Sequence, residues 1–140
     1  MSQQDVEVVR HLFDAQAEGD VSAWFQGADT DIRVFPRSEE PDAAVEYRGL
    51  DALMEYLLNW YGQWDSYEAQ LLEIFDAGKH VLVVTREHGR VVSTGIEVIE
   101  DFWHSFAVRD GKIAEWRMYD SRAEALEAVG LSEHDAPDPL

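Results

Sequence analysis

The stretch that decides the fold contains two alternating strand patterns joined by a tight turn. The first is Phe102-Trp103-His104-Ser105-Phe106, the turn is Arg109-Asp110-Gly111-Lys112, and the second is Trp116-Arg117-Met118-Tyr119-Asp120. A short segment rich in Ala, Leu and Glu follows. Alternation of apolar and polar residues predicts half-buried strands, and Asp-Gly between them predicts a hairpin. One histidine, His104, is therefore expected among aromatic side chains on one face of a sheet.

The chain has 140 residues, enough for one sizeable core and too few for two ordinary domains. We expect a single domain over residues 1–131, followed by a polar, proline-containing tail at 132–140 that is predicted to be disordered. The whole chain has 11 Lys and Arg residues against 29 Asp and Glu residues, which gives a net charge of −18. This charge, without any basic cluster, argues against nucleic acid or an anionic membrane as a partner.

Cysteine is absent, which excludes disulfides, thiolate nucleophiles and cysteine-based metal sites. The first residues lack the features of a signal peptide, and no apolar stretch approaches the roughly 20 residues of a membrane span. We therefore expect a cytoplasmic protein. Glu87 and His88 resemble half a metal site, but neighbouring strand residues point to opposite faces. No metal and no other cofactor is predicted.

Helical and strand patterns cover the rest of the chain. Apolar spacing predicts helices at 4–18, 21–26, 52–63 and 122–129, with Asp51 as the N-cap of the third. Strands are predicted at 32–36, 67–75, 81–87, 96–108 and 113–120. Helices followed by antiparallel strands indicate an α+β fold, in which a curved, mostly antiparallel sheet carries helices in its concave face. The mouth of such a sheet is a natural pocket.

Several segments resemble the SnoaL-like branch of the nuclear transport factor 2-like superfamily, over residues 5–131. They are Asp42–Leu53 before the third helix, Ile74–Val81 before a strand, and Phe106–Ile113 leading to Tyr119–Leu131. The resemblance implies a conical α+β barrel that usually dimerises through its sheet, so a homodimer is expected. The same fold carries isomerases, cyclases, dehydratases, hydrolases and non-catalytic domains, so it does not define the reaction.

The resemblance also suggests which residues could act as acid and base. In the polyketide cyclases of this family, a histidine on the long strand and a carboxylate on the last strand do so. His104 falls at the place of that histidine, whereas Met118 stands at the place of the carboxylate. A thioether cannot carry a proton, and Asp120 is the nearest acid on the same side of the strand.

The turn decides which residue lies opposite His104. A two-residue turn at Asp110-Gly111 would pair His104 with Arg117. A type I turn followed by a bulge at Gly111 would pair it with Trp116 instead. We prefer the second register, because it collects the apolar side chains of both strands on one face.

The preferred register also places Glu100 opposite Asp120. Two carboxylates across a ladder repel, so one of them is predicted to keep its proton near neutral pH. The candidate catalytic residues are therefore His104, Asp120 and Glu100. Alternatively, His104 is a core histidine with satisfied nitrogens, and the two acids are solvated charges at strand ends.

The expected function is binding of a small apolar or aromatic molecule in the cone-shaped pocket. One alternative is a cofactor-independent acid/base enzyme of the cyclase, isomerase or dehydratase type, which uses His104 with Asp120 or Glu100. The other is a dimerisation domain without turnover. The candidate ligand-binding residues are Phe102, Phe106, Trp116, Met118, Trp60 and Tyr47.

Overall fold

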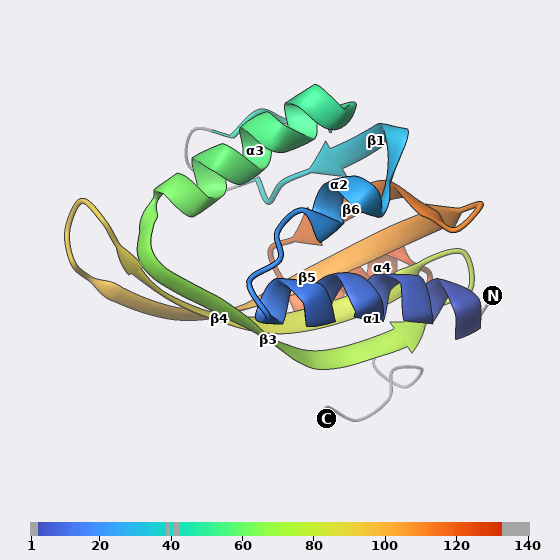
Figure 1. The fold of residues 1–140 in the computed structure, drawn as a ribbon. Helices are drawn as coiled ribbons and strands as arrows, with labels where there is room; N and C mark the ends of the chain where they lie inside the picture. Colours follow the sequence, from blue (N-terminus) through green and yellow to red (C-terminus); the bar gives the residue numbers. More distant parts are fainter. Residues whose placement is uncertain (1–2, 39, 41–42, 133–140) are drawn as a thin grey trace.

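A curved six-stranded sheet forms the body of the computed structural model, which describes residues 3–38, 40 and 43–132 (Figure 1). Of the tail predicted at 132–140, residues 133–140 lie outside the described residues. The sheet order is β2-β1-β6-β5-β4-β3, with β1 and β6 parallel and the other neighbours antiparallel. The strands are β1 (Ala28–Phe35), β2 (Tyr47–Arg48), β3 (Trp64–Asp76), β4 (Val81–Val91), β5 (Glu97–Arg109) and β6 (Lys112–Tyr119).

Three helices cover the concave face of this sheet, and a fourth packs on the opposite face. The first three are α1 (Gln3–Ala17), α2 (Ala23–Gln26) and α3 (Leu50–Gly62), and the fourth is α4 (Arg122–Ala128). The α+β fold with an unclosed, cone-like sheet is confirmed, and only α4 departs from the expected concave placement. Within the described part of the chain, no helix is long and apolar enough to span a membrane.

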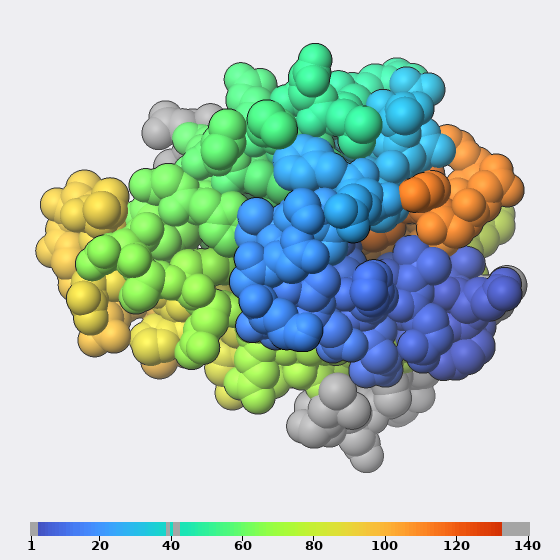
Figure 2. Space-filling view, viewed as in Figure 1, coloured from blue at the N-terminus to red at the C-terminus, as the bar shows by residue number. Residues whose placement is uncertain are grey.

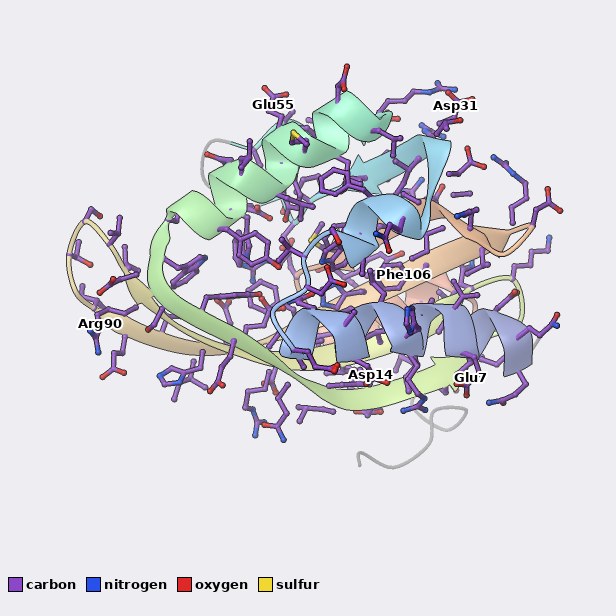
Figure 3. The ribbon with its side chains drawn as sticks, in the orientation of Figure 1. Glu7, Asp14, Asp31, Glu55, Arg90 and Phe106 are labelled. Atoms are coloured by element: carbon purple, nitrogen blue, oxygen red, sulfur yellow. The ribbon has the colours of Figure 1, made fainter. Side chains whose placement is uncertain are left out.

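The core lies between α1 and the sheet. Val6, Val9, Leu12 and Phe13 recur at helical spacing and are buried. Each such side chain contributes about 1.5–3 kcal/mol when it leaves water. Figure 3 shows Phe106 of β5 pointing into the space next to α1, whereas Glu7 and Asp14 point away from it. The acidic residues of α1 therefore face solvent, while its apolar stripe closes the concave side.

The start of α3 differs from the prediction. Gly49, not Asp51, is the N-cap residue, with φ of +90° and no side-chain cap. This positive φ favours glycine, and the Gly49 amide donates to the Ile32 carbonyl at 2.8 Å. Asp51 lies in the first turn, where a carboxylate still favours the helix dipole. The helix ends at Gly62, and Trp64 begins β3, three residues before the strand predicted at 67–75.

Both predicted registers of the β5–β6 hairpin are wrong. His104 pairs with Met118 rather than with Arg117 or Trp116. Asp110 and Gly111 form a two-residue turn with φ of +52° and +77°, as a type I′ turn requires. Beyond that turn the register shifts by one, because Ala114 is an extra residue on β6.

The side chains of β5 and β6 nevertheless lie on the faces of the sheet that were predicted for them. The true register differs from the preferred one by two residues, and side chains alternate with a period of two. Phe106 therefore still shares a face with Trp116 and Met118.

One glycine of β4 allows an aromatic ring to lie directly on the strand. A Cβ atom at Gly89 would lie 2.5 Å from Cε3 of Trp64 and 3.0 Å from the carbonyl oxygen of Ser66. No side chain fits at that distance, so Trp64 can cover this part of the concave face only because position 89 is glycine.

The convex face is partly covered by α4. Ala125 and Leu126 of α4 pack on Leu82, and Trp103 and Tyr119 lie against this cluster. The helix begins at Ser121, whose hydroxyl accepts the Glu124 amide at 3.2 Å. The Arg122 guanidinium binds the buried Glu73 carboxylate at 2.8 Å, which ties α4 to β3.

Candidate functional site

A small cavity lies between the concave face and the helices α1, α2 and α3, and we call this space the cone. The cavity has a volume of about 30 Å³, room for one water-sized molecule. Its wall is mostly aromatic, and its polar side chains are Gln16, Glu87, His104 and three tyrosines. An apolar wall with few polar groups is the usual composition of a small-molecule site.

His104 of β5 is held in one tautomer by its neighbours. The Trp116 indole Nε1 donates to His104 Nδ1 at 3.0 Å. An indole can only donate, so Nδ1 carries no proton and the neutral ring has its hydrogen on Nε2. That nitrogen lies 3.0 Å from the Thr85 hydroxyl and donates to it. Burial, with a smaller effect of Arg37, lowers the pKa of His104 to about 3, so the imidazole is neutral.

The hydrogen bonds continue in one direction from His104 to Glu87 of β4. The Thr85 hydroxyl accepts from His104 and donates to Glu87 Oε2 at 2.7 Å. The Tyr67 hydroxyl of β3 donates to the other oxygen, Oε1. His104 Nε2 lies 3.8 Å from Glu87 Oε2, so the two residues communicate through Thr85 rather than as an ion pair.

Glu87 is the titratable group of the cavity. Burial raises its pKa to about 7, although the hydrogen bonds from Tyr67 and Thr85 and the charge of Arg37 oppose that rise. Both protonation states are therefore populated near neutral pH. A carboxyl group in this condition can both accept and donate a proton.

A second polar group enters the cone from the loop after β1. The Tyr56 hydroxyl of α3 donates to Glu40 Oε2 at 3.1 Å and lies 3.3 Å from the Met118 sulfur. Burial raises the pKa of both Glu40 and Tyr56. The Tyr56 hydroxyl therefore stays protonated and can donate to a bound molecule.

Arg37, also from this loop, supplies a positive charge that acts on Glu87. Its guanidinium carbon lies 4.0 Å from the centre of the Phe102 ring, and its Nη1 binds Glu100 at 2.9 Å. This charge lowers the pKa of both Glu87 and His104. Arg37 thus influences the cone electrostatically without lining the cavity.

The residues predicted to bind a ligand lie at or next to the cavity, and their binding role stays a prediction. Phe102, Trp116, Met118 and Trp60 line the cavity together with His104. The other two predicted residues are one layer removed from it. Phe106 stacks behind His104 with ring centres 6.1 Å apart, and Tyr47 packs against Tyr56 at 5.3 Å.

The predicted contact between Glu100 and Asp120 is wrong. In the observed register Glu100 of β5 pairs with Glu87 of β4. The pair of β5 and β6 farthest from the turn is Trp103 with Tyr119. The two-residue turn and the extra residue Ala114 each move the register by one residue and together cause this difference of two from the preferred register. The Asp120 carboxylate accepts the Ser38 hydroxyl at 2.7 Å, and neither acid lines the cavity. The two acids bind the loop after β1 instead of sharing a proton.

The acid of the cone, Glu87, was not predicted as a site residue and was considered only as half of a metal site. The signal was present in β4, where Val81, Val83, Thr85, Glu87 and Gly89 alternate and are all buried. Four interior positions in this alternation predict that the fifth, a glutamate, also faces the interior. The partner Tyr67 comes from a separate strand, so its contact with Glu87 depends on the β3–β4 register.

Comparison with known proteins identifies the family. The SnoaL-like domain matches residues 9–116, and the chain belongs to this family. Comparison with curated proteins gave no match.

Solved structures share the fold. A nuclear transport factor 2-like protein from Burkholderia xenovorans LB400 is 28% identical, with 93% of this chain and 98% of that chain covered and a TM-score of 0.68. One from Burkholderia thailandensis E264 is 25% identical, with 84% and 90% covered and a TM-score of 0.75. TerC, co-crystallised with polyporic acid, is 16% identical, with 91% and 98% covered and a TM-score of 0.74.

Proposed function

We propose that the cone binds a small carbonyl compound and that Glu87 transfers a proton to and from the carbon next to its carbonyl group. The observation that carries this proposal is a buried carboxyl on an aromatic cavity wall, with a pKa of about 7. A base with this pKa is half ionised near neutral pH, where proton transfer in both directions is most effective.

The proposed reaction needs no group beyond the bound molecule and the side chains of the cone. Glu87 accepts a proton from the carbon, and the electron pair of that C–H bond forms the C=C bond of an enolate. The carbonyl oxygen takes the negative charge and a hydrogen bond from the Tyr56 hydroxyl, whose single proton turns from Glu40 to the substrate. Return of the proton to the same carbon restores the substrate, and return to a conjugated carbon isomerises it.

In this proposal Glu87 replaces the acid that the family resemblance led us to seek on the last strand. Met118 occupies that place and lines the cavity without carrying a proton. His104 acts as a positioning residue rather than a base, because both of its nitrogens are hydrogen-bonded. Through Thr85 it orients the Glu87 carboxylate.

Deuterium exchange tests this function without knowledge of the natural substrate. Acetone and cyclohexanone in D₂O lose the NMR signal of the protons next to the carbonyl when a base removes them. We expect the protein to accelerate this loss and Glu87→Gln to abolish the acceleration. Glu73→Gln is the matched control, because Glu73 is equally buried but lies under α4 on the other face. Equal exchange by Glu87→Gln and the unchanged protein would contradict the proposal.

A dimerisation domain without turnover is the second candidate, and the small volume of the cavity favours it. In that case the aromatic side chains fill the cone, and Glu87 only forms part of a buried polar network. No exchange above the buffer rate with either ketone would then be observed.

A homodimer is also proposed, whereas a cytoplasmic location stays a prediction. The β4–β5 hairpin extends away from the body of the protein at the left of Figures 1 and 2. It exposes Val92, Ile96 and Ile99 by 60% or more. Neighbouring exposed apolar residues are typical of interaction surfaces, and a second copy of the chain is the partner proposed. The molecular mass from solution scattering decides between monomer and dimer.

A further inference from the structure

A second depression lies against the cavity from the outside, and we call it the outer cleft. It has a volume of about 260 Å³, and its lining includes Gln16, Gly19, Val21, Tyr61, Tyr67 and Ala69. The end of α1, the turn before α2, the end of α3 and the start of β3 meet there, where blue and green atoms adjoin in Figure 2. Gln16, Tyr61 and Tyr67 also line the cavity. These three side chains are therefore the wall between the two spaces.

Tyr67 is the part of this wall that contacts the reactive group. Its hydroxyl donates to Glu87 Oε1, and its ring makes edge contacts with Tyr61 at 5.5 Å and Trp60 at 6.0 Å. The other oxygen, Oε2, is held by the fully buried Thr85. Oε1 is therefore the oxygen that a ligand can approach, and the Tyr67 ring fills the space from which the ligand would do so.

The size of the cavity indicates what must move. A volume of about 30 Å³ is too small for a six-membered ring, since a cavity of about 150 Å³ accommodates benzene. The Tyr67 side chain is itself a phenol ring. Its movement into the outer cleft, which is much larger than the cavity, would vacate the space of one such ring beside Glu87.

We infer that Tyr67 occupies the place of the ligand, and that the ligand is a single six-membered ring bearing a hydroxyl or carbonyl oxygen. The ligand arrives through the outer cleft, displaces the Tyr67 side chain into that cleft, and places its ring beside Glu87 Oε1 with its oxygen toward the Tyr56 hydroxyl. This inference rests on the proposed function, because it takes the Glu87 site as the place of binding. Phenol is the natural probe, since it is a stable analogue of the enol of a six-membered ring ketone.

A different route into the cone is less favourable. A depression of about 380 Å³ lies between the loop after β1 and strand β6, and among the described residues Met118 alone lines both this depression and the cavity. Hydrogen bonds from Arg37 to Glu100 and from Ser38 to Asp120 hold the loop over that side. Passage there requires both contacts to break, whereas passage from the outer cleft requires the movement of Tyr67.

Phenol binding, followed by tryptophan fluorescence and by NMR, tests the role of Tyr67. Tyr67→Phe keeps the ring but loses the hydrogen bond to Glu87, so the ring leaves more easily and phenol should bind about 2- to 10-fold more tightly. Tyr119→Phe is the matched control, because Tyr119 lies on the convex face and bonds Ser105. A cone in which Tyr67 is only a packed wall would give equal affinities for the two variants, and this result would overturn the inference.

Filling the outer cleft tests the route. Ala69→Phe leaves no room for the displaced Tyr67 ring, so phenol affinity should fall about tenfold or more. Ala44→Phe is the control, because Ala44 lines the competing depression beside β6. Ala69→Leu replaces Ala69→Phe if circular dichroism shows that the larger residue prevents folding. Equal affinities for variants at positions 69 and 44 would overturn the route.

The same variants separate this inference from the proposed function. If Glu87→Gln abolishes ketone exchange while Tyr67→Phe and Ala69→Phe leave both exchange and phenol affinity unchanged, the function stands and the role of Tyr67 is wrong. If phenol binds as predicted but Glu87→Gln does not affect exchange, the role of Tyr67 in binding stands and proton transfer by Glu87 is wrong.

Discussion

The indole nitrogen of Trp116 donates a hydrogen bond of 3.0 Å to Nδ1 of His104. Because an indole never accepts, this contact fixes the imidazole proton on Nε2 and sets the direction of the hydrogen bonds that end at Glu87. Trp116 thus determines, from β6, which atoms of β5 and β4 donate and which accept.

Replacement of Trp116 by Phe should release the tautomer of His104. The ¹⁵N NMR spectrum of the histidine should change from a single Nε2-protonated form to a mixture of both tautomers. The free energy of unfolding should fall by about 1–3 kcal/mol, because a buried acceptor loses its partner. Trp103→Phe is the control, since Trp103 Nε1 has no hydrogen-bond partner among the described residues. An unchanged His104 spectrum in Trp116→Phe would contradict this account.

Glu87 and His104 predict opposite pH dependences of stability. Burial raises the pKa of Glu87 from 4.5 to about 7, so the folded protein keeps a proton that the unfolded chain loses, and stability falls as pH rises from 4.5 to 7. Burial lowers the pKa of His104 from 6.5 to about 3, so stability is lost as pH falls from 6.5 to 3. Each slope is about 1.4 kcal/mol per pH unit, so the two cancel between pH 4.5 and 6.5.

Removing one of these two groups should reveal the pH dependence of stability that the remaining group causes. Relative to the unchanged protein, Glu87→Gln should gain stability with rising pH between 4.5 and 7. As pH rises from 3 to 6.5, His104→Asn should instead become less stable relative to the unchanged protein. The reason is that the unchanged protein gains stability from His104 over this range and the variant does not. Urea unfolding at intervals across pH 3–8 measures both differences. Difference curves without slope would mean that both groups titrate as they do in water.

Arg37→Met should raise the pKa of both Glu87 and His104. The positive charge of Arg37 lowers both values, so its removal favours the protonated forms. Titration followed by ¹³C NMR for the carboxyl and ¹⁵N NMR for the imidazole measures the two shifts. Arg86→Met is the control, because Arg86 pairs with Asp101 on the exposed side of β4. Equal titration curves in the two variants would show that Arg37 is too distant to act on the cone.

Gly89→Ala should destabilise the protein by about 1–3 kcal/mol, since the new methyl group must push against Trp64 and the backbone of Ser66. Gly62→Ala at the end of α3 meets no atom within 4 Å and should be neutral or slightly stabilising. Thermal unfolding of both variants gives the comparison. Similar melting temperatures would mean that the Trp64 ring moves aside without cost.

The order of elements could be predicted from sequence because periodicity reports local burial. The helix at 4–18 and the strands of the β5–β6 hairpin were within one or two residues of those observed. Strand β2 was missed, because two residues are too few to show a pattern. Its pairing with β1 depends on a contact between segments 13 residues apart or more.

The site was predicted less well than the fold. His104 was placed correctly in an aromatic interior, but its donor, Trp116, was expected only as a wall. Glu87 was passed over, and its neighbour Tyr67 was treated only as the start of a strand. The bulge at Ala114 in β6 and the register shifts between β3 and β4 decide these contacts. Neither irregularity can be recognised from the sequence pattern.

The single extra residue Ala114 keeps charge out of the cone. If Ala114 paired with Ala107 as an ordinary ladder residue, the pairing that starts at Asp110-Gly111 would continue unshifted, and His104 would face Arg117. The two faces of β6 would then exchange, with Arg117 turned inward and Trp116 turned toward the convex side. Deletion of Ala114 would instead straighten β6 without exchanging its faces, because Glu115 would follow Ile113 directly and His104 would still pair with Met118.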